Sequence, residues 1–134
     1  TPNETEAEIL TGVKVIDTAS AEEAARILLS KGVKNVVITL AEKGALIASK
    51  GTVQHVPGFR VDPVDTVAAG DAFNGALAVG IIRGESLVQA TRFANAVGAL
   101  TVTKNGAIPS LPSRQAVQEF LYNNDSVDAS TLQD

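Results

Sequence analysis

The sequence predicts an α/β fold on the strength of three observations. Residues 36–40 form a short run of apolar, mostly β-branched residues, as expected of a strand buried on both faces of a parallel sheet. Segments in which apolar residues recur at helical spacing precede and follow this run, an alternation typical of α/β proteins. Hydrophobic residues make up 45% of the 134 positions, enough for one globular domain with a sizeable core.

Two helices are expected before this strand. Thr1 and Glu4 have the spacing of a capping box, and Gly12 is expected to end the first helix. A second capping box at residues 20–23 begins another helix, which is predicted to stop at residues 31–32.

Two strands and a long helix are expected next. Residues 44–56 are predicted to form two strands joined at Lys50-Gly51. From about residue 69 to Arg83 apolar residues recur at helical spacing, and Gly84 ends this helix. Because the helix is apolar on nearly all sides, it is expected to be buried.

Two further helices complete the prediction. A capping box at Ser86 opens an alanine-rich helix that stops near residues 104–106. Ser113 then begins a last helix that runs through about Tyr122. The polar residues 123–134 are expected to form a flexible tail.

Composition and charge exclude several classes of function. The 11 basic residues are scattered among 15 acidic ones, and the formal net charge of −4 argues against a nucleic-acid partner. Without cysteine there is neither a disulfide nor a thiolate metal site, and no apolar stretch is long enough for a membrane span. A cytoplasmic protein with no targeting segment is expected. His55, the single histidine, has no neighbouring acid or base in the sequence and is interpreted as a surface residue.

One carboxylate, Asp71, stands between a glycine and an apolar run at the predicted start of a helix. The backbone N–H groups of about Ala68 to Asp71 lack helical partners there, and the helix dipole attracts anions. Asp71 is therefore either a charge that complements the dipole or a general base beside a bound phosphoryl group. The local pattern leaves both interpretations open.

A longer motif favours the second interpretation. The segment DTVAAGDAFNGA at residues 65–76 resembles the D-T-x-G/A-A-G-D-x-F-x-G-A signature of the ribokinase-type (PfkB) sugar kinases. Residues 3–6, NETE, resemble the N-x-x-E motif of the same family, and the resemblance covers about residues 1–122. It implies the C-terminal half of a ribokinase-like three-layer α/β/α sandwich, with residues 1–122 as its nucleotide-binding and catalytic part.

The resemblance also implies an activity, the ATP-dependent phosphorylation of D-ribose at its 5-hydroxyl to ribose 5-phosphate. Asp71 would be the general base. The implied anion hole for the transferred phosphoryl group is formed by Ala68, Ala69, Gly70 and Asp71. The residues implied to bind ATP are Asn3, Thr39, Leu40, Ala41, Glu42, Lys43, Gly44, Gly70, Asp71 and Asn95.

Two cations are implied as well. Asn3 and Glu6 would help to place Mg²⁺ through water, although both residue types are also ordinary in the first turn of a capped helix. The implied K⁺ site is formed by Asp65, Val67, Thr101, Lys104, Gly106 and Ser110. The alternatives at these positions are an Asx turn at Asp65 and an ordinary helix exit at residues 101–110.

Two departures from the family pattern shape the remaining expectations. Ala41 stands where ribokinases usually have glycine, and its added Cβ could crowd the nucleotide or require a backbone angle unfavourable to alanine. The sugar-binding half of the family has no counterpart here, so a non-catalytic nucleotide- or phosphate-binding module, an inert folding unit, or a parent kinase for another sugar or nucleoside are alternatives. The expected partners are ATP and D-ribose, and a homodimer formed by strand pairing or exchange at the edge of residues 36–40.

Overall fold

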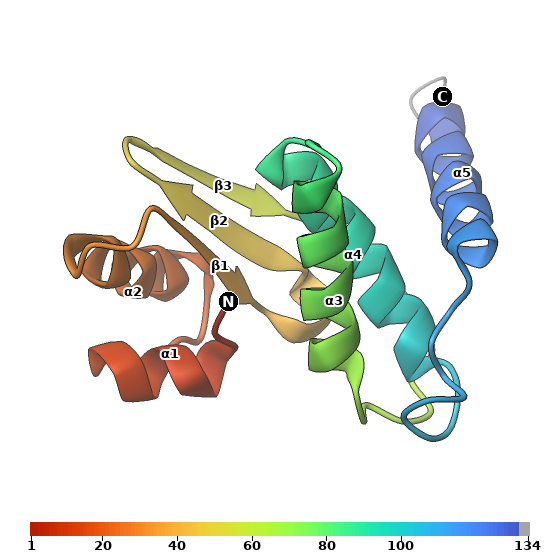
Figure 1. Ribbon diagram of the computed structural model, residues 1–134, viewed down its shortest axis with the longest axis horizontal. Helices are drawn as coiled ribbons and strands as arrows, with labels where there is room; N and C mark the ends of the chain where they lie inside the picture. Colours follow the sequence, from red (N-terminus) through yellow and green to blue (C-terminus); the bar gives the residue numbers. More distant parts are fainter. Residues whose placement is uncertain (132–134) are drawn as a thin grey trace. The chain divides into compact units, whose positions relative to one another are not determined.

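The computed structural model describes residues 1–131, in two compact units (Figure 1). The first unit is Thr1–Phe59 and contains two α-helices and a three-stranded sheet, while the second begins at Arg60 and contains three helices. None of the helices in the described part of the chain is long and apolar enough to cross a membrane.

The sheet of the first unit is an antiparallel meander of β1 (Asn35–Thr39), β2 (Ala45–Ser49) and β3 (Thr52–Val56). The predicted strand pair at 44–56 is confirmed. The predicted parallel sheet is wrong for the described residues, in which β1 pairs antiparallel with β2 and makes a single parallel bridge, from Thr39 to Asn3. A strand buried on both faces has the same apolar composition whichever way its neighbour runs, so the pattern could not separate the two cases.

Helices α1 (Glu4–Thr11) and α2 (Thr18–Ser30) pack against the same face of this sheet (Figure 1). On β1 and β2, alternate residues point to that face, because side chains in a strand alternate between its two sides. The small side chains of α2 let the helix backbone come close to the sheet. The core formed here includes Ala7, Ala21, Ala24, Ala25, Val36, Ile38, Leu40, Leu46 and Ala48.

The predicted helix ends are confirmed in this unit, but the predicted N-caps are wrong. Gly12 caps α1 in the left-handed conformation, with φ of 78°. The N-cap of α1 is Asn3, which forms a capping box with Glu6, and that of α2 is Asp17, which forms one with Ser20. Polar residues at capping-box spacing overlap in both segments, so the pattern fits two registers and the backbone selects one.

The second unit is built around an antiparallel pair of helices, α3 (Ala69–Ile82) and α4 (Leu87–Val102) (Figure 1). The predicted box at Ser86 is confirmed, since its side chain caps α4 together with Gln89. The helices approach closely at Gly80, where an added Cβ would lie 2.7 Å from the Cβ of Ala90. Glycine is required at this contact because any side chain would push the two helices apart.

The prediction that α3 is buried all round is wrong for the described structure. Its buried residues are Ala72, Phe73, Ala76, Leu77 and Gly80, which lie on one side. Val79, Ile81 and Ile82 are exposed, the last to 84%. An apolar composition on all sides shows that a helix could be buried on every face, but in this structure only one face of α3 packs against α4.

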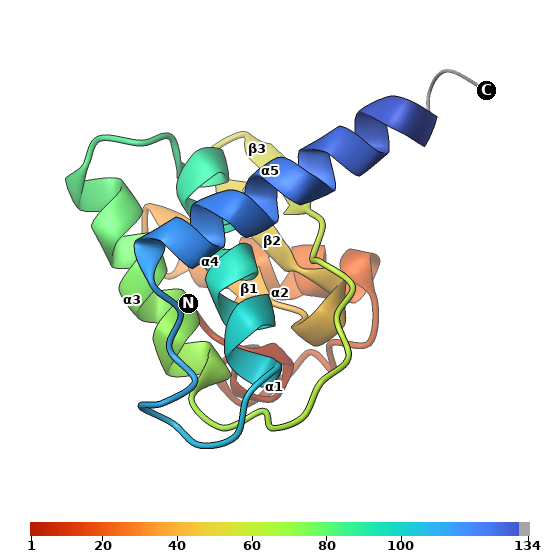
Figure 2. The same ribbon diagram turned by 90° about the vertical axis from the view of Figure 1, so that its right-hand side faces the viewer.

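Helix α5 (Arg114–Thr131) packs on α4 (Figure 2) and is joined to it by an ion pair between Arg92 and Asp125. Its predicted start is confirmed, because Ser113 accepts from the N–H of Ala116. Its predicted end at Tyr122 is wrong, and no glycine or proline after Pro112 would stop the helix there. Flexibility of residues 123–134 stays a prediction, and residues 132–134 lie outside the described residues.

Candidate active site

The start of α3 has an unusual backbone. Its N-cap, Ala68, is in the left-handed conformation with φ of 64°, which costs an L-residue roughly 1–2 kcal/mol. No side chain of the described residues caps this helix. Of the four predicted anion-hole groups, the N–H of Ala69 donates to the carbonyl of Thr66 at 3.3 Å. The N–H groups of Ala68, Gly70 and Asp71 have no partner among residues 1–131 and remain available to an anion.

Asp71 is the third residue of α3, in the first turn of the helix. Its side chain is exposed, and within the described part of the chain its carboxylate makes no hydrogen bond or ion pair. It is not used as a cap, although a carboxylate at this end of a helix is favoured by the dipole. A free carboxylate beside free N–H donors has the arrangement that a general base and an anion-binding site require.

Asp65 organises the loop that leads into α3. One oxygen of its carboxylate accepts from the N–H of Val67 and the other from the N–H of Gly106, each at 3.0 Å. These two hydrogen bonds lower the pKa of the Asp65 carboxyl, the bond from Val67 contributing more. The N–H groups of Val64 and Asp65 both donate to the carbonyl of Val102, at 2.7 and 3.1 Å. The loop is thereby fixed to the C-terminal end of α4, as both views of the ribbon show (Figures 1 and 2).

The residues of the predicted K⁺ site lie in this loop, in the last turn of α4 and in the segment that follows that helix. Thr101 is fully buried and its hydroxyl donates to Val97, while the fully buried Ser110 donates to the carbonyl of Ala107. Lys104 and Gly106 follow directly after α4, and Gly106 is bonded to Asp65. The structure thus brings Val67 and Gly106 to the Asp65 carboxylate, whereas among the described residues no hydrogen bond links Thr101, Lys104 or Ser110 to it. The role of Val102 was not predicted, because a carbonyl acceptor leaves no trace in residue type.

Asn95, predicted to lie near adenine, is in the middle of α4 and is 8% exposed. Gly98, one turn further along the same helix, faces the start of α3, since an added Cβ there would lie 3.8 Å from the carbonyl oxygen of Ala69. Positions three apart are neighbours on a helix surface. Asn95 therefore lies within about a turn of the point where α4 contacts the start of α3.

In the first unit, Asn3 and Glu6 are used in a reciprocal cap. The Asn3 side chain accepts from the N–H of Glu6 at 2.8 Å, and the Glu6 carboxylate accepts from the N–H of Asn3 at 2.9 Å. Both residues therefore have the helix-capping role that was the alternative to placing Mg²⁺. The bridge from Asn3 to Thr39, with the Thr39 N–H donating to Pro2, places this cap beside the end of β1.

The predicted nucleotide-binding segment follows that strand end as a tight turn. A short 3₁₀ helix spans Ala41–Lys43, and the N–H of Leu40 donates across it to the carbonyl of Gly44 at 2.8 Å. The expected unfavourable angle at Ala41 is confirmed, with φ of 49°. Among residues 1–131, Ala41 and Ala68 are the only non-glycine residues with positive φ, and both lie in predicted ligand-binding segments. Backbone strain of this kind is concentrated at functional sites.

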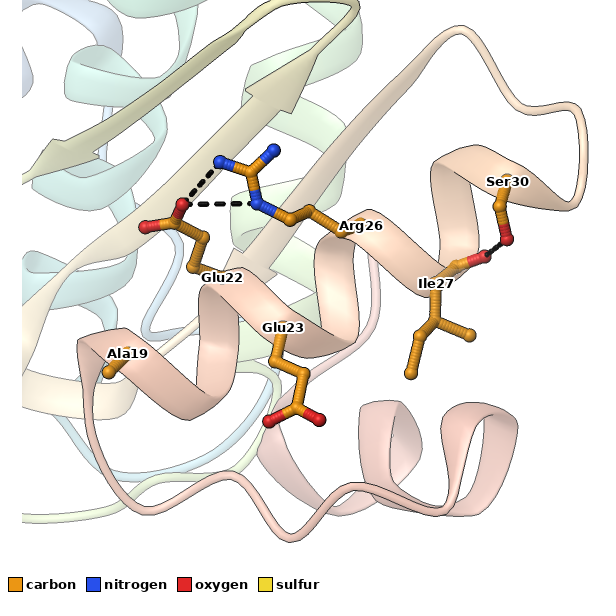
Figure 3. A pocket seen from close by; sticks show the side chains of 6 residues that line it. All are labelled: Ala19, Glu22, Glu23, Arg26, Ile27 and Ser30. Carbon is orange, nitrogen blue, oxygen red and sulfur yellow. Dashed lines mark hydrogen bonds and ion pairs between the residues drawn. The ribbon is translucent and has the colours of Figure 1, made fainter.

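A shallow hollow lies on α2, and none of its lining residues belongs to these segments (Figure 3). Its lining consists of Ala19, Glu22, Glu23, Arg26, Ile27 and Ser30. All six come from one helix, and the cation of Arg26 is paired with Glu22. Within residues 1–131 there is also no cluster of three or more histidine or acidic side chains able to hold a metal.

Comparisons with known proteins agree with the motifs. The family model described as pfkB family carbohydrate kinase matches residues 1–114. A ribokinase of Haemophilus influenzae is 49% identical over 121 residues, which are 90% of this chain and 40% of the relative.

Two solved structures share the fold. The structure of Arabidopsis thaliana ribokinase complexed with ribose and ATP matches at a TM-score of 0.84 and 36% identity, over 90% of this chain and 39% of that one. A fructokinase double mutant from Vibrio cholerae O395, with fructose, ADP and potassium ion bound, matches at a TM-score of 0.78 and 35% identity, over 89% of this chain and 39% of that one. The chain therefore spans about two fifths of the length of the relatives it matches.

Proposed function

The chain belongs to the pfkB family of carbohydrate kinases and has part of the ribokinase-like α/β fold, and from this premise we propose that it is the nucleotide-binding and catalytic part of an ATP-dependent ribokinase. The proposed reaction transfers the γ-phosphoryl group of ATP to the 5-hydroxyl of D-ribose. The observation that carries the proposal is the start of α3, where the free Asp71 carboxylate stands in the same helical turn as unpaired N–H donors.

The second unit supplies the chemical step in this proposal. The Asp71 carboxylate takes the proton of the sugar hydroxyl as that oxygen bonds to the γ-phosphorus, and the bond from the γ-phosphorus to the bridging oxygen of ADP breaks. The N–H groups of Ala68, Gly70 and Asp71 donate to the phosphoryl oxygens and stabilise the charge that develops on them. Because these donors are fixed in the backbone, they need no rearrangement during the reaction.

The donors around Asp65 fit a monovalent cation. Carboxylate, carbonyl and hydroxyl oxygens form an all-oxygen set, which suits a hard cation such as K⁺, and we propose Asp65, Val67, Thr101, Lys104, Gly106 and Ser110 as its ligands. The related fructokinase of Vibrio cholerae has a potassium ion bound in its structure, which supports such a site in this family. Bound K⁺ would add positive charge close to the loop that precedes α3.

For the first unit we propose a role in binding MgATP. The turn Thr39–Gly44 follows a strand end, where α/β proteins commonly bind ligands. In the capping box of α1, Glu6 uses only its Oε2 atom, so Oε1 can accept from a water bound to Mg²⁺. Bound Mg²⁺ would neutralise charge on the phosphates.

ADP formation by the purified chain tests the proposed function. The assay uses MgATP in potassium buffer with D-ribose, 2-deoxyribose, D-fructose or no sugar, and compares the parent chain with Asp71→Asn. We expect ADP formation that depends on D-ribose and is lost in the variant. Equal turnover by Asp71→Asn would contradict the assignment of the base, and faster turnover of fructose would favour a kinase for another sugar.

A second candidate function is a nucleotide- or phosphate-binding module without turnover. The observation that favours it is the set of unpaired N–H groups at Ala68, Gly70 and Asp71, which can bind an anion whether or not a transfer follows. MgATP binding without ADP formation in the same experiment would support this candidate.

We also propose that the chain forms a homodimer through β1. Among the described strands β1 is at the edge of the sheet, and unpaired edges tend to pair with another copy. Sedimentation equilibrium tests this proposal, with a dimer expected and a monomer at all concentrations contradicting it.

A further inference from the structure

The carbonyl oxygen of Lys43, in the turn after β1, accepts two hydrogen bonds. His55 on β3 contacts it through Nε2 at 2.7 Å, and the N–H of Gly58 donates to it at 3.3 Å. A carbonyl oxygen can only accept, so Nε2 of His55 carries the proton and donates. His55 is exposed, as expected of a surface residue, and its ring also reaches across the sheet end to the predicted nucleotide-binding segment.

Backbone packing fixes the same turn from the same side. A Cβ added at Gly44 would lie 2.2 Å from the carbonyl oxygen of Val56 and 2.4 Å from the nitrogen of Gly58. A Cβ added at Gly58 would lie 2.4 Å from the carbonyl oxygen of Glu42. The segments 42–44 and 56–58 are thus packed backbone against backbone, and the His55 side chain adds a hydrogen bond to that contact.

We infer that His55 is a positioning residue for the nucleotide: its hydrogen bond to the Lys43 carbonyl holds the strained turn Ala41–Gly44 in the shape that binds MgATP. The inference rests on the proposed function. It is supported by the need to hold Ala41 at a positive φ, a conformation that persists only where surrounding contacts determine it.

Three variants of the full chain test the inference. His55→Val removes the donor but keeps a residue suited to a strand, and His55→Gln keeps an N–H donor at the end of the side chain. Gln54→Val is the matched control, since Gln54 is the adjacent exposed residue on the opposite side of β3. The readouts are amide hydrogen exchange at Lys43 and Gly44, the Kd for MgATP, and the midpoint of thermal unfolding.

We expect His55→Val to raise amide exchange in the turn and weaken MgATP binding by about three- to tenfold, the range of one net hydrogen bond. His55→Gln should restore both to within about twofold, and the unfolding midpoint of His55→Val should equal that of Gln54→Val. A purely structural role would instead lower the midpoint and leave the Kd of the folded protein unchanged. That result, or unchanged exchange in His55→Val, overturns the inference.

Failure of the proposed function gives a different pattern. A parent chain that does not bind MgATP contradicts the proposed function and overturns the nucleotide role of His55. Slower exchange at Lys43 and Gly44 in the parent than in His55→Val would then still establish the hydrogen bond as a constraint on the turn.

Discussion

Helices α1 and α3 both have an acidic residue in the first turn, where backbone N–H groups lack partners within the helix. These N–H groups are capped by side chains in α1 but not in α3. In α1, Asn3 and Glu6 satisfy each other's backbone N–H groups in a capping box. In α3, a left-handed alanine replaces the capping side chain, and Asp71 makes no hydrogen bond within the described residues. A carboxylate in the first turn therefore occurs in both helices. The start of α1 is closed, meaning that side chains occupy its N–H donors, and the start of α3 is open, meaning that its donors are left unpaired.

The difference shows what an anion-binding helix end requires. A capping side chain is worth about 1 kcal/mol but occupies the donors that a phosphate would need. The start of α3 has no capping side chain, and Ala68 there is in a strained backbone conformation. The start of α1 is thus stabilised by its own cap, which leaves only Oε1 of Glu6 available to a ligand, whereas the start of α3 leaves backbone donors available to an anion. Each assignment can be tested.

The largest effect is expected from Asp71→Asn. If Asp71 is the general base, kcat for ribose phosphorylation should fall by about 10²- to 10⁴-fold. The Kd for MgATP should change by less than about threefold, because the backbone donors stay in place. Steady-state kinetics and calorimetric titration measure the two quantities, and an unchanged kcat would make the start of α3 an ordinary uncapped helix end.

A smaller loss is expected from Asn3→Ala at the closed end. Removing the N-cap should lower the free energy of unfolding by about 1 kcal/mol, measured by urea denaturation. If the residue only caps α1, kcat will be the same as in the parent. A fall in kcat larger than tenfold would show instead that Asn3 takes part in placing the phosphates.

Gly70→Ala separates stability from binding at the open end. A Cβ at this position meets nothing within 4 Å, and alanine in place of glycine should stabilise the helix by about 0.5–1 kcal/mol. The same Cβ leans toward the helix start, where it narrows the space for a phosphate. We expect a higher unfolding midpoint together with weaker MgATP binding, and tighter binding would contradict the proposed anion site.

The smallest effect concerns Asp65 and pH. Its folded-state pKa is lowered by the bonds from Val67 and Gly106, so its contribution to stability is present above the usual value of 3.8 and is lost as the pH falls through the folded value. Asp65→Asn should therefore have a lower unfolding midpoint than the parent at pH 7, and the difference between the two midpoints should shrink as the pH falls below 3.8 through the folded value. If the difference between the two unfolding midpoints stays the same across this pH range, the hydrogen bonds from Val67 and Gly106 do not stabilise the charged Asp65 carboxylate.

The sequence predicted the helices and strands well but not all of their contacts. Glycine often ends a helix because it adopts the left-handed conformation easily, so a single residue in the sequence signals the helix end. The helix ends at Gly12 and Gly84, which both have positive φ, were predicted correctly for this reason. The N-cap of α1 was misplaced because the boxes starting at Thr1 and at Asn3 overlap. The direction of the neighbour of β1 was wrong because apolar composition reports burial and not pairing.

At the candidate site, the features that depend on a short stretch of sequence could be predicted. The loop and helix of residues 65–76 were placed correctly, and so was the unfavourable angle at Ala41. That Asp65 and Gly106 belong to one site came only from the family resemblance, since 41 positions separate the two residues, and the hydrogen bond from the Gly106 N–H to the Asp65 carboxylate was not predicted. The contact of His55 with Lys43 was missed because it depends on the register of the β2–β3 hairpin and on a backbone acceptor, neither of which residue types reveal.

Amide chemical shifts of the ¹⁵N-labelled chain during titration with MgATP test the central claim most directly. If the open end of α3 binds phosphate, the N–H signals of Ala68, Gly70 and Asp71 will show the largest downfield shifts, and the capped N–H of Ser20 at the start of α2 will not move. Saturation with MgATP that leaves the signals of residues 68–71 unchanged would contradict the claim that this helix end is a phosphoryl-binding site.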